Sequence, residues 1–351
     1  MNDKRRGRYG QGESSAGWRR LLVVVCGMVA AAVMLAACGG GGDSGSTSAD
    51  SSSGSTGDVT FGFSLPFGEV PISVVTQNLV KEDAEAKGWS VLIDATKGGN
   101  IQEQTATLET WITQGVTAVS VLPTEPSAFD AIAKRAIADG VVWTAYNVEM
   151  DEGAGGAVFP PAVTGKVAGE AAVKWINAND PEAEVLVLKA GISSLEERTS
   201  VAAEMIEEET KAKIVATQAS TEEAKGLQTT ETVLQAHPDI TVVIGCNDDT
   251  ALGAAEAFRK AGTKKPSEVF ILGEDGTEEA LNELLDPQSF FRATVATDLP
   301  KAAEEVVNVA ARAIENEWQP GDKQEYVEVP QTSIENGDTS LIKEFLAVYE
   351  K

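Results

Sequence analysis

The sequence has few of the side chains that most enzymes use, and its only histidine is His237. This histidine stands in "QAHPD", between a helical pattern and a strand pattern, so we do not expect general acid-base catalysis. No G-x-x-x-x-G-K-[ST] or G-x-G-x-x-G motif follows a strand pattern, so a glycine-rich loop that binds a phosphate or a dinucleotide is not expected. No pair of carboxylates stands at a spacing that would fix the geometry of a glycosidase. We therefore expect no enzymatic activity and no cofactor, with a lipid-anchored enzyme as an open alternative.

Cysteines and basic residues are also scarce. Of the 3 cysteines, Cys26 and Cys38 lie near the N-terminus, which leaves Cys246 as the only thiol of the folded part. An intramolecular disulfide or a multi-cysteine metal site is therefore not expected there. The chain has 28 Lys and Arg against 54 Asp and Glu, a net charge of −26, whereas nucleic-acid binding needs the opposite sign. The plain interpretation of this charge is solubility.

The N-terminal residues resemble a bacterial export signal. Basic residues are frequent in residues 1–20, and the apolar run "LLVVVCGMVAAAVMLAA" follows up to residue 37. The tetrapeptide "LAAC", ending at Cys38, resembles the lipobox of bacterial lipoproteins, in which the cysteine carries lipid. Residues 39–58 are rich in Gly, Ser, Thr and Asp and have no apolar residue larger than Ala, which predicts a flexible tether. We therefore expect a signal peptide at residues 1–37 and a lipidated cysteine with its tether at residues 38–58. The lipid would be the only contact with the membrane. An uncleaved apolar segment that anchors the chain in the membrane is the alternative.

The remaining residues alternate apolar runs of strand length with amphipathic helical patterns. One helical pattern, residues 71–88, has Pro71 in its first turn and Gly88 at its end. Repeated strand and helix predict right-handed crossovers and a doubly wound α/β fold with parallel sheets. Nine runs fit strands that are covered on both faces, namely residues 59–65, 89–95, 116–122, 141–147, 184–190, 213–219, 241–247, 269–275 and 292–298.

Nine strands are too many for one ordinary core, and the segment "GGAVFPPAVTGKVAGE" at residues 155–170 offers a break. We therefore expect two Rossmann-like lobes. The expected N-lobe comprises residues 59–161 and 299–325, and the expected C-lobe comprises residues 162–298 and 326–351.

At this point the sequence resembles the periplasmic sugar-binding proteins of the ribose-binding type, which deliver ligands to ABC importers. The resemblance implies two lobes joined by three crossovers near residues 161, 298 and 325, with a ligand held between the lobes. It extends over residues 58–330 and is carried by "TGKVAGE" (164–170), "ERTSVAAEM" (197–205), "KGLQTTETVLQAHPDITVVIGCNDDTALGA" (225–254), "ILGEDGTEEAL" (271–281) and "RATVATDLPKAAEEVVNVAARAI" (292–314).

Polar residues at the ends of the strand patterns agree with this resemblance, because open α/β sheets bind ligands beyond the carboxyl ends of their strands. The resemblance implies ligand contacts by Ser64, Arg198, Asn247 and Asp275. A helix cap is the alternative role for Asn247, and a surface ion pair is the alternative for Arg198. The complete set of predicted ligand contacts is Ser64, Phe67, Glu69, Thr124, Tyr146, Asn147, Arg198, Asn247 and Asp275.

The N-lobe part departs from the family pattern. Residues 69–72, "EVPI", stand where ribose binders carry two stacking aromatics, and Tyr146-Asn147 replaces an Asp-Arg pair. Thr221 stands where a C-lobe aromatic is common, so ribose is not the expected ligand. Phe67, Tyr146 and Phe159 remain as candidate stacking surfaces.

The junction "VIGCNDDTALGA" places four polar or reactive side chains between a strand and a helix. Strand alternation predicts that Cys246 is buried opposite to Asn247, as a small filler. Asp248 and Asp249 are expected to cap and charge the helix start, with Asp248 a weaker candidate for the cleft.

These observations together predict an exported, monomeric binding protein that takes a small sugar or polyol and passes it to an ABC transporter permease. Two alternatives remain open, presentation of the ligand to a chemoreceptor or sensor kinase and binding of a non-sugar solute. An intracellular repressor would need a basic helix-turn-helix, which the sequence lacks.

Overall fold

The structure is a computed structural model that describes residues 59–192 and 195–350. The expected export signal, lipidated Cys38 and tether lie outside these described residues. None of the helices within the described ranges is long and apolar enough to cross a membrane.

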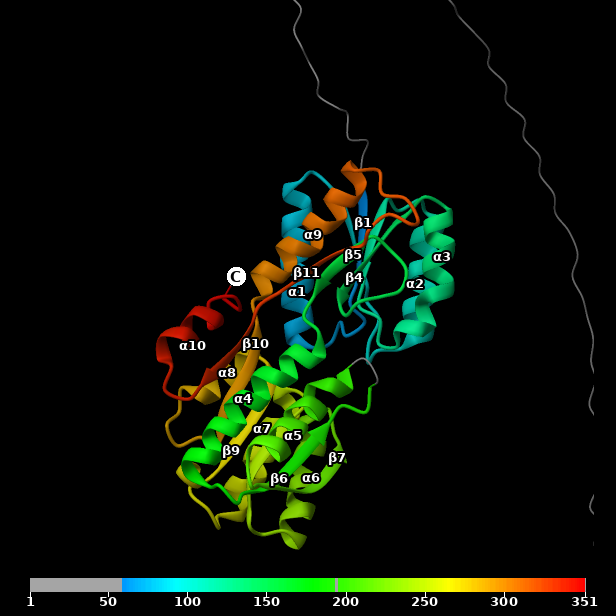
Figure 1. The fold of residues 1–351 in the computed structure, drawn as a ribbon. Helices are drawn as coiled ribbons and strands as arrows, with labels where there is room; N and C mark the ends of the chain where they lie inside the picture. Colours follow the sequence, from blue (N-terminus) through cyan, green and yellow to red (C-terminus); the bar gives the residue numbers. More distant parts are fainter. Residues whose placement is uncertain (1–58, 193–194, 351) are drawn as a thin grey trace, which may run out of the picture. The chain divides into compact units, whose positions relative to one another are not determined.

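The first sheet, which defines the N-lobe, has the strand order β11-β5-β4-β3-β1-β2, and all of its neighbouring strands are parallel. Helices α1 and α9 pack on one face around Phe61 and Phe63, and helices α2 and α3 pack on the other around Trp143 (Figure 1). The elements of this lobe are β1 (Thr60–Ser64), α1 (Pro71–Ala86), β2 (Ser90–Ile93), α2 (Ile101–Thr113), β3 (Ala118–Val121), the 3-10 helix η1 (Pro126–Phe129), α3 (Asp130–Ala138), β4 (Val142–Asn147), β5 (Gly155–Val158), α9 (Leu299–Glu315) and β11 (Glu325–Glu328).

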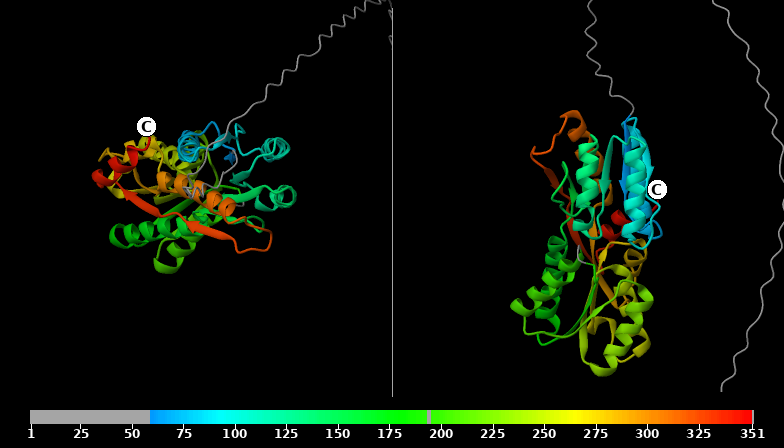
Figure 2. Two further views of the ribbon diagram at one scale, coloured as in Figure 1. Left: turned by 90° about the horizontal axis from the view of Figure 1, so that it is seen from above. Right: turned by 90° about the vertical axis from the view of Figure 1, so that its right-hand side faces the viewer.

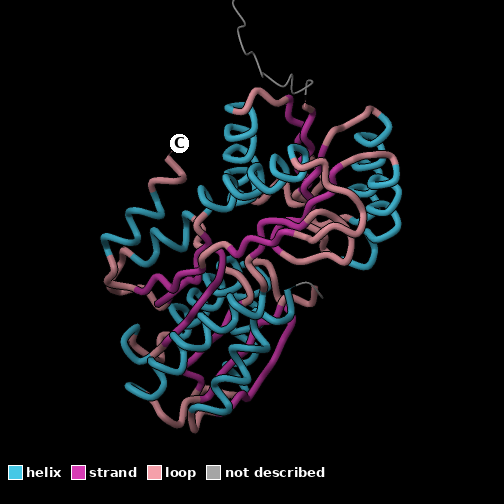
Figure 3. The backbone as a smooth tube through the Cα atoms, turned by 45° about the horizontal axis from the view of Figure 1, so that its top comes forward, coloured by secondary structure: helices cyan, strands magenta, loops and turns pink. Residues whose placement is uncertain are grey.

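The second sheet, which defines the C-lobe, has the order β12-β10-β9-β8-β6-β7, in which only β12 is antiparallel to its neighbour. Helices α4 and α5 cover one face, and α6, α7, α8 and α10 cover the other. Figure 3 shows the helices and strands of both lobes in separate colours. The elements are α4 (Pro161–Asn179), β6 (Glu184–Lys189), α5 (Glu196–Glu209), β7 (Lys213–Ala219), α6 (Glu223–Ala236), β8 (Ile240–Gly245), α7 (Asp248–Ala261), the 3-10 helix η3 (Pro266–Glu268), β9 (Phe270–Asp275), α8 (Glu278–Leu284), β10 (Phe291–Thr297), β12 (Gln331–Glu335) and α10 (Thr339–Leu346).

The chain passes between the two sheets three times. The passages lie at residues 159–160, at residue 298 and at residues 329–330. The third lies later than residue 325, because β11 pairs with β5 and keeps the chain in the N-lobe sheet through Glu328. The orange to red part of the chain in Figures 1 and 2 contains the second and third passages. The doubly wound α/β fold with two lobes is confirmed.

All nine predicted strands are present, but β5, β11 and β12 were not predicted from the sequence. β5 begins with two glycines inside the segment that the sequence analysis treated as a break. Gly155 has a φ of 122°, and a Cβ there would overlap the backbone of Glu325 in β11. Glycine at this position therefore permits the pairing that places β11 at the edge of the N-lobe sheet.

Candidate functional site

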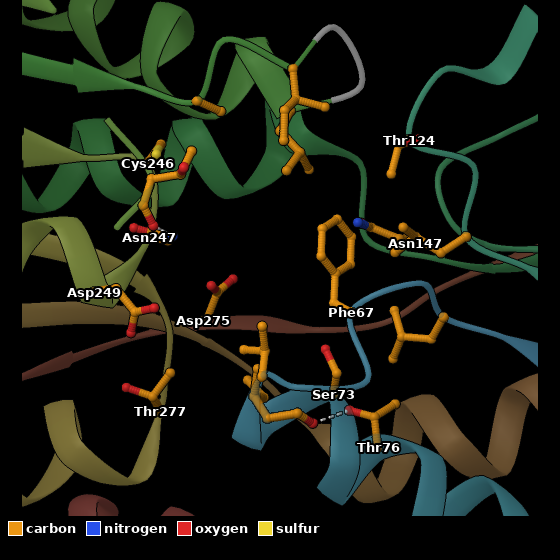
Figure 4. Close-up of a pocket in the computed structure, with 18 of the residues that line it drawn as sticks. Phe67, Ser73, Thr76, Thr124, Asn147, Cys246, Asn247, Asp249, Asp275 and Thr277 are labelled. Atoms are coloured by element: carbon orange, nitrogen blue, oxygen red, sulfur yellow. Dashed lines mark hydrogen bonds between the residues drawn. The ribbon is translucent and has the colours of Figure 1, made fainter. Parts of the chain in front are cut away.

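A cavity of about 520 Å³ lies between the lobes, and residues from both lobes line it. Its walls come mainly from the loops and the starts of helices that follow the strands, which places the cavity at the carboxyl ends of the parallel strands of both sheets. This is the position that a doubly wound fold favours for a ligand, because the loops there diverge and the helices begin with free N–H groups. Figure 4 shows Asn247, Asp249 and Asp275 on one side of the cavity and Phe67, Thr124 and Asn147 on the other.

The structure brings eight of the nine predicted contact residues to this cavity. They are Phe67, Glu69, Thr124, Tyr146, Asn147, Arg198, Asn247 and Asp275.

Ser64 does not line the cavity, which corrects its predicted position. Its side chain is fully buried, where its hydroxyl donates to Asp94 Oδ2 at 2.7 Å and accepts from Gln104 Nε2 at 2.9 Å. Gln104 also donates to the carbonyl of Leu122, a cavity residue that directly follows β3, the strand beside β1 in the sheet. Ser64 therefore supports the cavity wall from behind and offers no hydrogen-bonding group to a ligand.

Arg198 enters the cavity wall from the first turn of α5. Its Nη1 donates to Asp275 Oδ1 at 2.7 Å and to the carbonyl of Cys246 at 3.3 Å. Glu274 Oε2 lies 3.5 Å from Nε, so two carboxyl groups face this one cation. Burial lowers the pKa of Arg198, but Asp275 and Glu274 raise it, and the net shift is upward. The alternative of a surface ion pair is excluded, because only 8% of the side chain is exposed.

Asp275 is the last residue of β9 and has a φ of 110°, which is unusual for a residue with a Cβ. The turn that follows it is held by several hydrogen bonds. The amide N–H of Gly276 donates to Thr294 Oγ1 at 3.2 Å, and the carbonyl of Gly276 accepts from the Tyr349 hydroxyl at 2.8 Å. The surrounding structure thus maintains a strained backbone at a cavity residue, which is typical of functional sites.

The fully buried Asp248 provides further support for this turn and does not line the cavity. One of its carboxyl oxygens accepts from the amide and the hydroxyl of Thr277, at 2.7 and 3.1 Å, and the other accepts from Thr294 Oγ1 at 2.6 Å. Burial and the nearby Asp275 raise the pKa of Asp248, while these hydrogen bonds oppose the shift. The sequence analysis considered Asp248 a weak candidate for the cleft, but Asp249 is the aspartate of this pair that lines the cavity.

Asn147 is the N-lobe counterpart of Asp275, since it ends β4 and has a φ of 75°. It is 4% exposed, and its Oδ1 has no hydrogen-bond partner among the described residues. A buried acceptor without a partner is costly unless another molecule supplies a donor. Two left-handed residues, one from each lobe, therefore face the same cavity.

Asn247 combines the two roles that the sequence analysis left open. Its Oδ1 accepts from the amide of Thr250 at 3.0 Å and caps helix α7, while its Nδ2 donates to the carbonyl of Thr221 at 2.9 Å. The remaining N–H of the amide is available to the cavity that Asn247 lines. Cys246 is buried, as predicted, and burial raises the pKa of its thiol. It nevertheless lines the same cavity as Asn247, which corrects its expected position on the opposite side.

The N-lobe wall is more apolar than the C-lobe wall. Tyr146 is buried, and its ring packs edge-on against Phe63 and Phe159, with ring centroids 5.3 Å apart in both pairs. Burial raises the pKa of the Tyr146 phenol. The remaining apolar lining residues of this lobe are Leu65, Phe67, Val70, Ile72, Leu122 and Leu299.

Sequence reasoning missed several polar lining residues. Ser73 and Thr76 lie three residues apart in α1, and this spacing places both on one face of a helix. Glu222 and Thr277 follow β7 and β9 and could have been found by extending each strand end by two or three residues. His237 lies elsewhere, since its Nδ1 is 3.9 Å from Glu184 at the amino end of β6. No group of acidic, histidine or cysteine side chains suited to a metal ion occurs in the described part of the chain.

The fold and the cavity together define a two-lobed α/β binding protein. The family model described as "periplasmic binding protein domain" matches residues 61–317, and the chain belongs to this family.

Curated relatives agree with this assignment. The ribose import binding protein RbsB of Bacillus subtilis (strain 168) is 31% identical over 251 residues, which cover 70% of this chain and 78% of the relative. The D-allose-binding periplasmic protein of Escherichia coli (strain K12) is 29% identical over 225 residues, covering 60% of this chain and 70% of the relative.

Solved structures share the fold. A galactofuranose binding protein matches with a TM-score of 0.72 at 21% identity, covering 83% of this chain and 98% of that one. A Caulobacter myo-inositol binding protein, bound to myo-inositol, matches with a TM-score of 0.69 at 23% identity, covering 84% of this chain and 97% of that one. At these identities the structural likeness supports the fold and leaves the ligand of this chain open.

Proposed function

We propose that this protein captures a small sugar or polyol between its lobes and delivers it to the permease of an ABC importer. The observation that carries the proposal is the cavity itself, which Arg198 and Asp275 line from the C-lobe and Asn147 lines from the N-lobe. The curated relatives are named for sugar import or sugar binding, and this supports the same class of ligand.

The chemistry of the two walls suits a hydroxylated ring. The C-lobe wall offers carboxylate acceptors at Asp249 and Asp275 and donors at Arg198 and Asn247, which can pair with several hydroxyl groups. The N-lobe wall offers the rings of Phe67 and other apolar surface, against which the C–H face of a sugar ring can pack.

The charges around the cavity favour an uncharged ligand over an anion. Asp275 and Glu274 already face the cation Arg198, and three further carboxylates line the cavity, namely Glu69, Glu222 and Asp249. A sugar acid or a sugar phosphate would add negative charge without gaining a free cation in this lining.

Family membership supports export, and the N-terminal residues extend this to a lipid anchor. We propose that Cys38 carries lipid and that residues 39–58 tether the binding domain to the outer face of the membrane. In this arrangement the domain would act as a monomer near its permease.

Isothermal titration calorimetry of the purified protein tests the proposed function. The probes are D-ribose, D-allose, L-arabinose, myo-inositol and glycerol, with D-galacturonate and L-lysine as charged comparisons. We expect at least one neutral probe to bind with a Kd below about 100 μM, which corresponds to roughly −5.5 kcal/mol. Binding of lysine or galacturonate in the absence of any neutral probe would disprove the sugar or polyol assignment. His237→Gln is the control, since it changes a residue outside the cavity.

The alternative partner is a chemoreceptor or sensor kinase, to which the closed protein would present its ligand. Both partners would contact the outer surfaces of the two lobes, so the cavity does not separate them. Genes for an ATPase and a membrane subunit beside this gene would favour transport, and a histidine kinase gene in that place would favour sensing.

A further inference from the structure

Glu274 has an unusual environment for a carboxyl group. It is the penultimate residue of β9 and is 0% exposed. Leu272, two residues earlier on the same face of the strand, packs in the core beneath α4 and α5. Neither carboxyl oxygen of Glu274 has a hydrogen-bond partner among the described residues, although buried polar atoms are nearly always paired.

The group nearest to this carboxyl is the guanidinium of Arg198. Glu274 Oε2 lies 3.5 Å from Nε of Arg198, and this Nε also has no hydrogen-bond partner among the described residues. At the other end of the guanidinium, Nη1 donates to Asp275 at 2.7 Å. Asp275 therefore accepts from Nη1 of the planar guanidinium. Glu274 is the only described carboxyl that lies close enough to Nε to accept from it.

The charges in this region do not balance if every group is ionised. Three buried or half-buried carboxyls, Asp248, Glu274 and Asp275, surround the single cation Arg198, with the Cys246 thiol nearby. Asp248 accepts three hydrogen bonds and Asp275 forms the short ion pair, whereas Glu274 has only the long approach to Nε. Glu274 is therefore the carboxyl of this group whose negative charge has the fewest hydrogen bonds and the weakest ion pair to stabilise it. Consistent with this, burial raises the pKa of Glu274 well above its usual value, Arg198 opposes the shift, and Asp275 and Asp248 add to it.

We propose that Glu274 is a positioning residue: its ionised carboxylate accepts from the Nε–H of Arg198 and orients the guanidinium toward the cavity, so that ligand affinity rises with pH. When Glu274 is protonated, its carboxyl group is a much weaker acceptor. The guanidinium of Arg198 is then oriented by its hydrogen bond to Asp275 alone. The link to affinity rests on the proposed function, whereas the orientation of Arg198 does not.

The first experiment needs no ligand and uses the side-chain Nε–H of Arg198 in ¹H–¹⁵N NMR spectra, assigned by its loss in Arg198→Lys. Spectra are recorded from about pH 5 to about pH 9, a range that extends upward from the ordinary Glu pKa. We expect the signal to titrate in the native protein. In Glu274→Gln, whose amide oxygen accepts at every pH, the signal should not change with pH, and in Glu274→Leu it should be broadened or lost. Glu278→Gln, an exposed change in α8, should retain the native titration.

Two results would overturn the positioning role. One is a native Arg198 signal that does not change over this pH range, and the other is a titration that persists unchanged in Glu274→Gln. Melting temperatures of the variants show whether Glu274→Leu is folded. If it is not, the isosteric Glu274→Gln alone tests whether the pH dependence of the Arg198 signal comes from Glu274.

The second experiment measures affinity by calorimetry with the five neutral probes at both ends of the pH range. For a probe that binds, we expect about tenfold weaker binding at the acidic end of the range. This is the change in affinity that uptake of one linked proton produces over one pH unit. We expect no such loss of affinity in Glu274→Gln. Equal pH dependence in both proteins would refute the coupling. If the Arg198 signal titrates as expected but none of the five probes binds, the proposed function fails while the positioning role stands.

Discussion

Replacing Asn147 with glycine should raise stability while lowering ligand affinity. Three terms set the stability change. Relief of the left-handed backbone at φ 75° contributes about 1 kcal/mol, and removal of a buried acceptor without a partner contributes about 1–3 kcal/mol. The extra freedom of glycine in the unfolded chain costs about 0.4–1 kcal/mol. The net gain is about 1–3 kcal/mol, or a melting temperature higher by about 2 °C or more for a domain of this size.

The same change should weaken ligand binding about tenfold, because the ligand loses a hydrogen bond inside a closed cavity. Differential scanning fluorimetry and calorimetry on one preparation measure the two effects together. Glu317→Gly is the matched control, since Glu317 is also left-handed, with a φ of 48°, but is exposed and outside the cavity. The control should keep its affinity. A lower melting temperature with unchanged affinity in Asn147→Gly would show that Asn147 has a structural role only.

Three further predictions concern the ligand, the fold and the anchor. Asp275→Ala should lose about 2 kcal/mol of binding free energy, close to 30-fold in Kd by calorimetry, and unchanged affinity would contradict a direct contact. Gly155→Ala should destabilise the fold by at least about 2 kcal/mol in urea titrations, because the new Cβ overlaps the Glu325 backbone. Gly140→Ala, which has φ 84° but open space around it, should cost less, and equal losses would refute the packing argument. Metabolic labelling with radioactive palmitate should label the native chain and not Cys38→Ser, and equal labelling of both would exclude a lipid at Cys38.

The fold could be predicted from the sequence wherever apolar runs were continuous. Seven of the nine strands found in this way lie inside their sheets, and the other two, β2 and β7, are edge strands whose own apolar residues still carry the pattern. The three missed strands form because they pair with neighbouring strands, and their own sequences carry little of the apolar pattern. β11 ("EYVE") and β12 ("QTSIE") are polar edge strands, and β5 exists because two glycines allow close approach of its neighbours.

The site was predictable where a residue follows a strand, at its end or in the next helix, and where its alternative role leaves it in the same place. Arg198, Asn247 and Asp275 all line the cavity, although Asn247 also caps a helix and Arg198 is also in an ion pair. Ser64 stands at a strand end too, but Asp94 and Gln104 take its hydroxyl. These partners lie 30 and 40 residues away, and local sequence contains no sign of such a contact.

Asp275 and Asn147, the left-handed residues that line the cavity from opposite lobes, differ in whether their side-chain oxygens are already paired, and this difference bears on closure. On the C-lobe side, Asp275 accepts from Nη1 of Arg198 and Asn247 caps a helix, so these lining groups are held in place before a ligand arrives, although Nε of Arg198 lacks a partner among the described residues. On the N-lobe side, the Oδ1 of Asn147 lacks a partner among the described residues. A ligand can drive closure only through contacts that differ between the open and closed states. We therefore expect the C-lobe to bind the ligand first and the hydrogen bond to Asn147 to form on closure. Asn147→Gly should then increase the dissociation rate more than it lowers the association rate, and stopped-flow fluorescence can measure both.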